Sequence, residues 1–180
     1  AYPDYNGLTI APLTVDITDN DAVGIVIGQS GGGTTVEEGG FGDTFTVALA
    51  SRPTANVTLT LAPGLQLAVM PSVLTFTPSN WNAPQLVSVT AVDDAVVEGS
   101  HAVTVPYSVA GSDPLYDGLA GAVNVAIMDN DVAGVMVTPS NGWTALTEGG
   151  DSDTYTLVLT SRPAANVLIS LTPGAQVSTS

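Results

Sequence analysis

An internal repeat constrains the fold of this chain more than any other feature of its sequence. Several short stretches recur at an offset of 110 residues, with no insertion between them, and about half of the overlapping positions are identical. The recurring stretches begin at Asp19, Glu38, Asp43, Ser51, Asn56 and Pro63, and their copies begin at Asp129, Glu148, Asp153, Ser161, Asn166 and Pro173. A fixed period of this kind is typical of repeat architectures.

The repeat divides the chain into three parts. A further match, between the segments beginning at Tyr5 and Tyr116, indicates that residues 1–18 are the C-terminal end of a preceding unit. Residues 19–131 then form a complete unit, and residues 132–180 form the first half of a following one. Half a sandwich cannot bury its own apolar face. We therefore expect either an excerpt from a longer array or a neighbouring chain that completes the half domain.

The spacing of the apolar residues predicts an all-β fold, because they alternate with polar residues and no helical stripe persists. We expect strands at Val23–Ile27, Thr44–Ala50, Asn56–Leu61, Val73–Thr77, Gln85–Val92, His101–Val109 and Gly121–Met128. About seven strands per unit is the number expected of an immunoglobulin-like Greek-key β-sandwich, here repeated in tandem. Pro106 lacks a backbone donor, which predicts an edge or bulge position for its strand.

The composition excludes several classes of function. The chain of 180 residues has 17 acidic and 2 basic side chains, a net charge of -15. So few cations cannot neutralise a nucleic-acid backbone or an anionic membrane surface. No apolar run approaches the roughly 18 residues of a membrane span. The absence of cysteine removes thiolate zinc sites and cysteine nucleophiles.

The sequence offers little for catalysis. His101 is the only histidine, and no nucleophile or base is placed around it by a known motif. Paired carboxylates could serve a glycosidase, but the same acidic residues recur in each copy, which an active site has little reason to do. We therefore expect that the chain is not an enzyme.

The carboxylates of the complete unit gather at strand ends. Even-numbered crossings of a sandwich return the chain to the same tip, so Glu38, the loop from Asp93 to Glu98 and the exit from Asp129 to Asp131 are expected to lie together. Such a cluster repels itself. A divalent cation compensates, and Ca²⁺ accepts 6–8 oxygen ligands in flexible geometry. The alternative is that the Asx-rich triplets only form turns and that the carboxylates are solvated.

Three motifs carry a resemblance to a known family. The segments at residues 36–39, 92–98 and 127–134 occur in the order of a Calx-β domain, the immunoglobulin-like calcium-binding module of sodium–calcium exchangers and of many bacterial extracellular repeat proteins. The resemblance implies calcium ligands at Glu38, Asp93, Asp94, Glu98, Asp129 and Asp131, at the repeat-equivalent positions Asp19, Asp21 and Glu148, and at Glu37 as a further candidate. The Gly-x-Asp-Tyr segment of the family has no counterpart between Pro63 and Phe76, which removes one expected ligand.

The position of the acidic triplet adds a mechanical hypothesis. Residues 129–131 close one unit and open the next, so an ion held there would stiffen the junction. We expect a structural calcium-binding segment of a large extracellular bacterial surface protein, such as a filament, stalk or adhesin. Its expected partners are neighbouring repeats or copies of the same protein, joined by strand complementation. Alternatives are a calcium-sensing regulatory domain and a carbohydrate-binding spacer with an exposed aromatic platform around Trp81 or Trp143.

Overall fold

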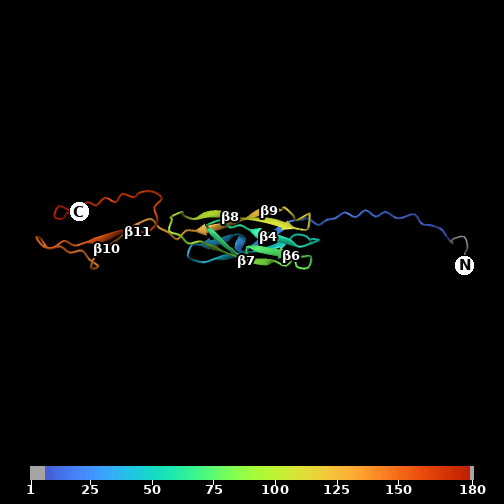
Figure 1. Cartoon of the computed structure of the whole chain (residues 1–180), viewed down its shortest axis with the longest axis horizontal. Coiled ribbons are helices and arrows are strands. Elements are labelled where there is room, and N and C mark those ends of the chain that lie inside the picture. Colours follow the sequence, from blue (N-terminus) through green and yellow to red (C-terminus); the bar gives the residue numbers. More distant parts are fainter. Residues whose placement is uncertain (1–6, 179–180) are drawn as a thin grey trace.

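The protein consists of a central β-sandwich with an extended segment before it and a β-hairpin after it (Figure 1). A computed structural model describes residues 7–178; residues 1–6, which include the repeat match at Tyr5, and residues 179–180 lie outside the described residues. The strands are β1 (Ile25–Gln29), β2 (Thr34–Glu37), β3 (Asp43–Leu49), β4 (Val57–Leu61), β5 (Leu67–Met70), β6 (Val73–Phe76), β7 (Gln85–Ala91), β8 (His101–Gly111), β9 (Ala120–Met128), β10 (Val135–Pro139) and β11 (Tyr155–Leu159).

Strands β1 to β9 form two packed sheets. One sheet has four strands in the order β1-β3-β7-β5, and the other has five in the order β2-β9-β8-β4-β6. Consecutive strands such as β3 and β4, or β7 and β8, lie in different sheets, which is the connectivity of an immunoglobulin-like sandwich. The predicted all-β, immunoglobulin-like fold is confirmed. Every strand pair is antiparallel except β2 with β9, which run parallel.

The sequence pattern located seven of the nine strands in this unit and missed two short ones. Strand β2 ends at Glu37, the first residue of the acidic pair, and it has a single apolar residue, Val36, so its sequence shows no alternation of apolar and polar residues. Strand β5, Leu67–Met70, consists of four consecutive apolar residues and therefore has no period of two to detect. Both are edge strands of their sheets.

Pro106 lies in the central strand β8, between β9 and β4, so the prediction of an edge or bulge position was wrong. Its carbonyl accepts a hydrogen bond of 2.9 Å from the Ala62 amide. Ala62 lies just beyond Leu61, the last residue of β4 in register with β8. The N–H and C=O of a strand residue point to the same side, so an N–H at position 106 would also point toward β4. It would lie beyond the last paired residue of the β4–β8 ladder, where the ladder requires no donor.

The core fills the space between the two sheets with the inward residues of both. Phe45, Val47 and Leu49 of β3 alternate with more exposed residues, as the period of two requires. Besides these three, the buried apolar residues are Val36, Val57, Leu59, Leu61, Leu67, Leu74, Phe76, Val87, Val89, Val105, Val109, Tyr116, Val123, Val125 and Ile127. No helix of the described residues is long and apolar enough to cross a membrane.

A buried tyrosine ties two loops together at the tip where β8 ends and β9 begins. The hydroxyl of Tyr116 donates to the carbonyl of Ser51 at 2.8 Å and accepts from the Ser51 amide at 3.1 Å. The neighbouring carboxylate of Asp113 is buried and accepts from the amide and the hydroxyl of Thr54, at 2.6 and 2.9 Å. These bonds lower the pKa of Asp113, with the Thr54 amide as the main cause.

We predict that Tyr116→Phe lowers the free energy of unfolding by about 1–3 kcal/mol, because two buried backbone groups of Ser51 lose their partner. Urea unfolding of the full chain measures the change. Tyr107→Phe is the matched control, since the Tyr107 hydroxyl makes no hydrogen bond with the described residues. Equal effects of the two substitutions would contradict the role given to the Tyr116 hydroxyl.

Candidate metal centre

The parallel pairing of β2 with β9 places two acidic residues side by side. Glu37 of β2 is in register with Met128 of β9. The next residue of each strand, Glu38 and Asp129, therefore leaves the sheet at the same tip. The Glu38 amide still donates to the Met128 carbonyl at 3.0 Å, which keeps the two segments together just beyond the end of β2.

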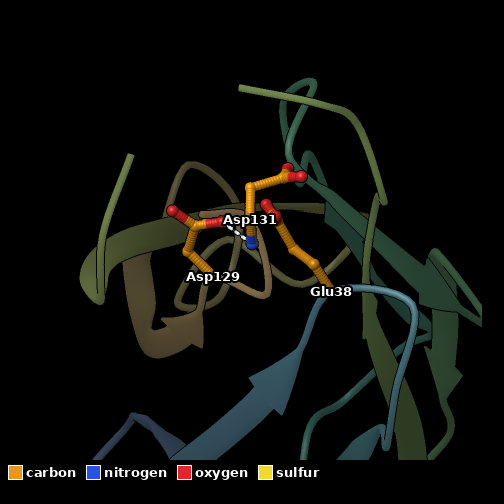
Figure 2. Close-up of side chains that lie close together, drawn as sticks. All are labelled: Glu38, Asp129 and Asp131. Carbon is orange, nitrogen blue, oxygen red and sulfur yellow. Dashed lines mark hydrogen bonds between the residues drawn. The ribbon is translucent and has the colours of Figure 1, made fainter. Parts of the chain in front are cut away.

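Three carboxylates converge at this tip. One oxygen each from Glu38, Asp129 and Asp131 lies within 4.8 Å of the other two. Figure 2 shows Asp129 and Asp131 from the exit of β9 gathered around the side chain of Glu38. Glu38 is only 2% exposed, which is rare for a glutamate without a charged partner.

Two of these carboxylates have a buried oxygen with no hydrogen-bond partner, Glu38 Oε2 and Asp131 Oδ2. Leaving a buried polar atom unpaired costs about 1–3 kcal/mol, and more for a charged group. No lysine or arginine offsets the charge: the ion pair present among residues 7–178 joins His101 to Glu98, at 3.8 Å. The arrangement supplies negative charge and free lone pairs but no cation.

The electrostatics of the cluster follow from this imbalance. Burial raises the pKa of Glu38, and the charges of Asp129, Asp94, Glu98 and Asp131 raise it further, in that order. Burial also raises the pKa of Asp131, helped by the charges of Asp129, Asp93 and Asp94. The charged forms of both groups are thus disfavoured where they stand.

Asp129 has a different environment. Its Oδ1 accepts from the Asp131 amide at 2.8 Å, and its Oδ2 accepts from the amides of Glu98 and Gly99 at 2.7 and 2.6 Å. The Asp131 amide, followed by the Gly99 amide, lowers the pKa of Asp129. Asp129 is therefore the anchor that fixes the loop before β8 to the exit of β9.

The loop between β7 and β8 brings further acidic residues to the same tip. Asp93 Oδ1 accepts from the side-chain amide of Asn130 at 3.1 Å, and that amide also donates to the Glu38 carbonyl at 2.8 Å. Asn130 therefore joins the Glu38 turn to the Asp93 loop. The sequence argument overlooked it, although it stands between the two aspartates that were chosen.

Glu98 and Glu37 are not among the residues whose oxygens converge. Glu98 accepts from the side-chain amide of Gln66 at 2.7 Å and lies beside His101. Gln66 is the long polar residue in the segment that has no Gly-x-Asp-Tyr motif. The carboxylate of Glu37 covers Gly40, since a Cβ added there would lie 2.6 Å from its Oε2.

The remaining predicted ligands lie elsewhere in this structure. Asp19 and Asp21 are exposed in the segment before the sandwich, where the Asp21 amide donates to Asp19 Oδ1 at 3.0 Å. Glu148 is exposed beyond β10. The structure thus gathers Glu38, Asp129 and Asp131, with Asp93 and Asp94 close by. Asp19, Asp21 and Glu148 lie apart from this group.

The ligand atoms at the tip are all oxygens. Carboxylates and carbonyls suit Ca²⁺ or Mg²⁺, and the absence of imidazole or thiolate argues against zinc or copper. The residues come from a turn, a loop and a strand exit, so their spacing can adjust. That adjustability matches the irregular coordination of Ca²⁺ better than the strict octahedron of Mg²⁺.

Comparisons with known proteins give a similarity of fold only. No family model matches the chain, and no curated protein sequence matches it. Similar solved structures include the apo form of the Calx CBD1 domain, with 17% identity, a TM-score of 0.41, and coverage of 59% of this chain and 98% of that one. CBD12 from CALX1.2 has 14% identity, a TM-score of 0.40, and coverage of 75% and 69%.

The Escherichia coli chaperone DraB has 10% identity, a TM-score of 0.41, and coverage of 63% of this chain. The match spans 58% of the chain of DraB, and likewise 58% of the periplasmic chaperone SfaE. At such low identities and TM-scores none of these structures carries a functional argument. The assignment of the immunoglobulin-like fold rests on the strand order of this chain itself.

We predict that Glu38→Gln stabilises the metal-free protein, because it removes a buried charge that has no partner. Thermal melts in chelator measure the shift. The pKa of Glu38 is raised from its ordinary value of 4.5, so the folded state binds its proton more tightly than the unfolded chain. The stability of the metal-free wild type therefore falls as pH rises from that value through the folded pKa.

The advantage of Glu38→Gln is thus expected above this pH interval and lost below it. Glu148→Gln is the matched control, the same change at the exposed equivalent position, and should have little effect at any pH. Asp129→Asn should destabilise the metal-free protein instead, since its oxygens hold three amides. A destabilising Glu38→Gln in chelator would refute this account of the tip.

Proposed function

We propose that the chain is a segment of tandem Calx-β-like domains that bind calcium and have a structural task in a large extracellular bacterial surface protein, such as a filament, stalk or adhesin. The observation that carries the proposal is the pair of buried carboxylate oxygens without partners, on Glu38 and Asp131. A cluster of acidic residues in solvent would have no such atoms. A bound cation supplies the missing counter-charge for both.

Calcium would be held between the turn after β2 and the exit of β9. Glu38 and Asp131 offer their free oxygens, and the charges of Asp93 and Asp94 lie near enough to raise the pKa of Asp131. Asp129 completes the trio while its amide contacts keep the loop in place. The bound ion provides positive charge, and the protein provides the oxygens and their spacing.

The site lies at the junction with the next unit. Only Val132, Ala133 and Gly134 separate Asp131 from the start of β10 at Val135. The acidic loop also contacts the next unit directly, because the Arg162 amide donates to the Ala95 carbonyl at 2.6 Å. An ion that fixes residues 129–131 and this loop therefore restrains the hinge between units.

The two tryptophans do not support a shared carbohydrate platform. Trp81 packs against the core of the sandwich, and its carbonyl accepts from the Leu49 amide. Trp143 is exposed after β10, beyond the junction. A calcium-sensing role uses the same site as the structural role, and the two differ in whether binding changes the domain or only stiffens it.

We predict that calcium raises the melting temperature of the full chain and that chelator reverses the rise. A ligand at 100 times its Kd stabilises the folded state by about 2.7 kcal/mol. Asp131→Asn and Glu38→Gln should abolish the rise, whereas Glu148→Gln should preserve it. Differential scanning calorimetry with Ca²⁺ and Mg²⁺ at matched ionic strength makes the measurement. A rise that survives both tip substitutions would place the binding elsewhere.

We also predict that calcium narrows the range of distances between the sandwich and the hairpin. The chain has no cysteine, so Ser88→Cys on β7 and Thr156→Cys on β11 give one spin-label pair on exposed positions. Electron paramagnetic resonance measures the distribution. The same pair in an Asp131→Asn background should stay broad. A shifted but equally broad distribution would favour the sensing role over the stiffening role.

A further inference from the structure

The acidic residues at the tip of the sandwich differ in whether their oxygens already have hydrogen-bond donors. Both oxygens of Asp129 accept from amides, and Asp94 Oδ1 accepts from the Val96 amide at 2.7 Å. Glu38 and Asp131, by contrast, each have a buried oxygen without a partner. Within residues 7–178, the buried carboxylate oxygens that lack a donor therefore belong to Glu38 and Asp131.

Asn130 supplies a neutral donor on the Asp93 side of the tip. Its side-chain amide donates to the Glu38 carbonyl at 2.8 Å and to Asp93 Oδ1 at 3.1 Å. Gly39 makes room for this contact, since a Cβ there would lie 3.0 Å from Asn130 Nδ2 and 3.1 Å from Asp93 Oδ1. Because both of these neighbours are acceptors, the NH₂ group of Asn130 faces them and its amide oxygen does not. Asn130 therefore places a positively polarised group where the Asp93 loop meets the Glu38 turn.

Gln66 supplies the same kind of donor to Glu98. Its side-chain amide donates to Glu98 Oε2 at 2.7 Å, and its own Oε1 lies 3.3 Å from His101 Nε2. Gln66 lies just before β5, in the segment that has no counterpart of the Gly-x-Asp-Tyr motif. This segment therefore brings an amide donor to the tip and no carboxylate.

A neutral donor and a cation compete for the same carboxylate. A hydrogen bond from an amide to a charged oxygen is one of the stronger kinds in proteins, and it occupies a lone pair of that oxygen. The N–H groups of Asn130 and Gln66 cannot ligate a metal, and their positive polarisation repels a cation nearby. A cation that binds the free oxygens of Glu38 and Asp131 displaces no such donor.

We propose that this tip holds a single calcium ion, bound by the three converging carboxylates (Figure 2), and that the amides of Asn130 and Gln66 take the places of further ions. The proposal rests on the calcium function proposed above and adds the number of ions and the residues that limit it. Three carboxylates offer up to two oxygens each, and water completes the 6–8 oxygens that one Ca²⁺ accepts.

The loop between β7 and β8 does not need a second ion. Such an ion would depend on the acidic residues of the loop, Asp93, Asp94 and Glu98, and each of them already accepts a hydrogen bond from an amide. All three are exposed, so water solvates their remaining oxygens. They therefore stay charged without a cation, unlike the buried Glu38.

Counting the bound ions tests the proposal. Native mass spectrometry of the full chain, titrated with calcium, gives the number of ions, and Asp131→Asn identifies those that the tip holds. We expect this substitution to remove one ion. Loss of two or more ions would keep the calcium function but overturn the single site. Calcium that survives the substitution would overturn the site itself, and a wild-type chain that binds no calcium would overturn the calcium function as well.

Replacing the amides by carboxylates tests why the tip holds one ion. Asn130→Asp and Gln66→Glu each remove a donor and add an oxygen ligand, so each should raise the count from one ion to two. Asn124→Asp is the matched control, because it makes the same change at an exposed position of β9, about 13 Å along the strand from Met128. It should leave the count at one. A count that stays at one in both tip variants would overturn the role of the amides.

A second measurement needs no calcium. In chelator, Asn130→Asp should melt about 4 °C or more below Asn124→Asp, because it loses two hydrogen bonds and adds a charge to the acidic tip. Gln66→Glu should also melt below Asn124→Asp, through its contact with Glu98, and replaces Asn130→Asp in the comparison if that variant does not fold. Equal melting temperatures of the tip variants and the control would overturn the proposal even where calcium binds.

Discussion

The parallel pairing of β2 with β9 joins the beginning of the unit to its end, and several other features depend on it. It closes one edge of the five-stranded sheet and covers the core around Val36 and Ile127. Because it is parallel, both strands leave the sheet at the same tip, which places Glu38 beside Asp129. An antiparallel pair at this position would have sent one of these carboxylates to the opposite end of the sandwich.

The buried carboxylates have two opposite roles in this fold. Asp43, Asp113 and Asp129 accept several hydrogen bonds from amides and hydroxyls, and their pKa values are lowered by those bonds. Glu38 and Asp131 are buried without such donors, and their pKa values are raised. The first group stabilises loops without any cation. The second group costs free energy in the metal-free protein. Under the proposed function a bound cation would offset this cost, so calcium affinity and metal-free stability would oppose each other.

This contrast also marks the limit of what the sequence could predict. Alternating apolar residues identified the long strands, and strand-end acids identified the tip, since both signals are local. Which carboxylate finds backbone donors depends on how residues far apart are folded together: Asp129 is anchored by Glu98 and Gly99, about thirty positions earlier. Asn130 was overlooked for the same reason, since its role appears only when the Asp93 loop and the Glu38 turn meet. Strands β2 and β5 were missed because their four residues do not alternate between apolar and polar types, unlike the last three residues of the equally short β6.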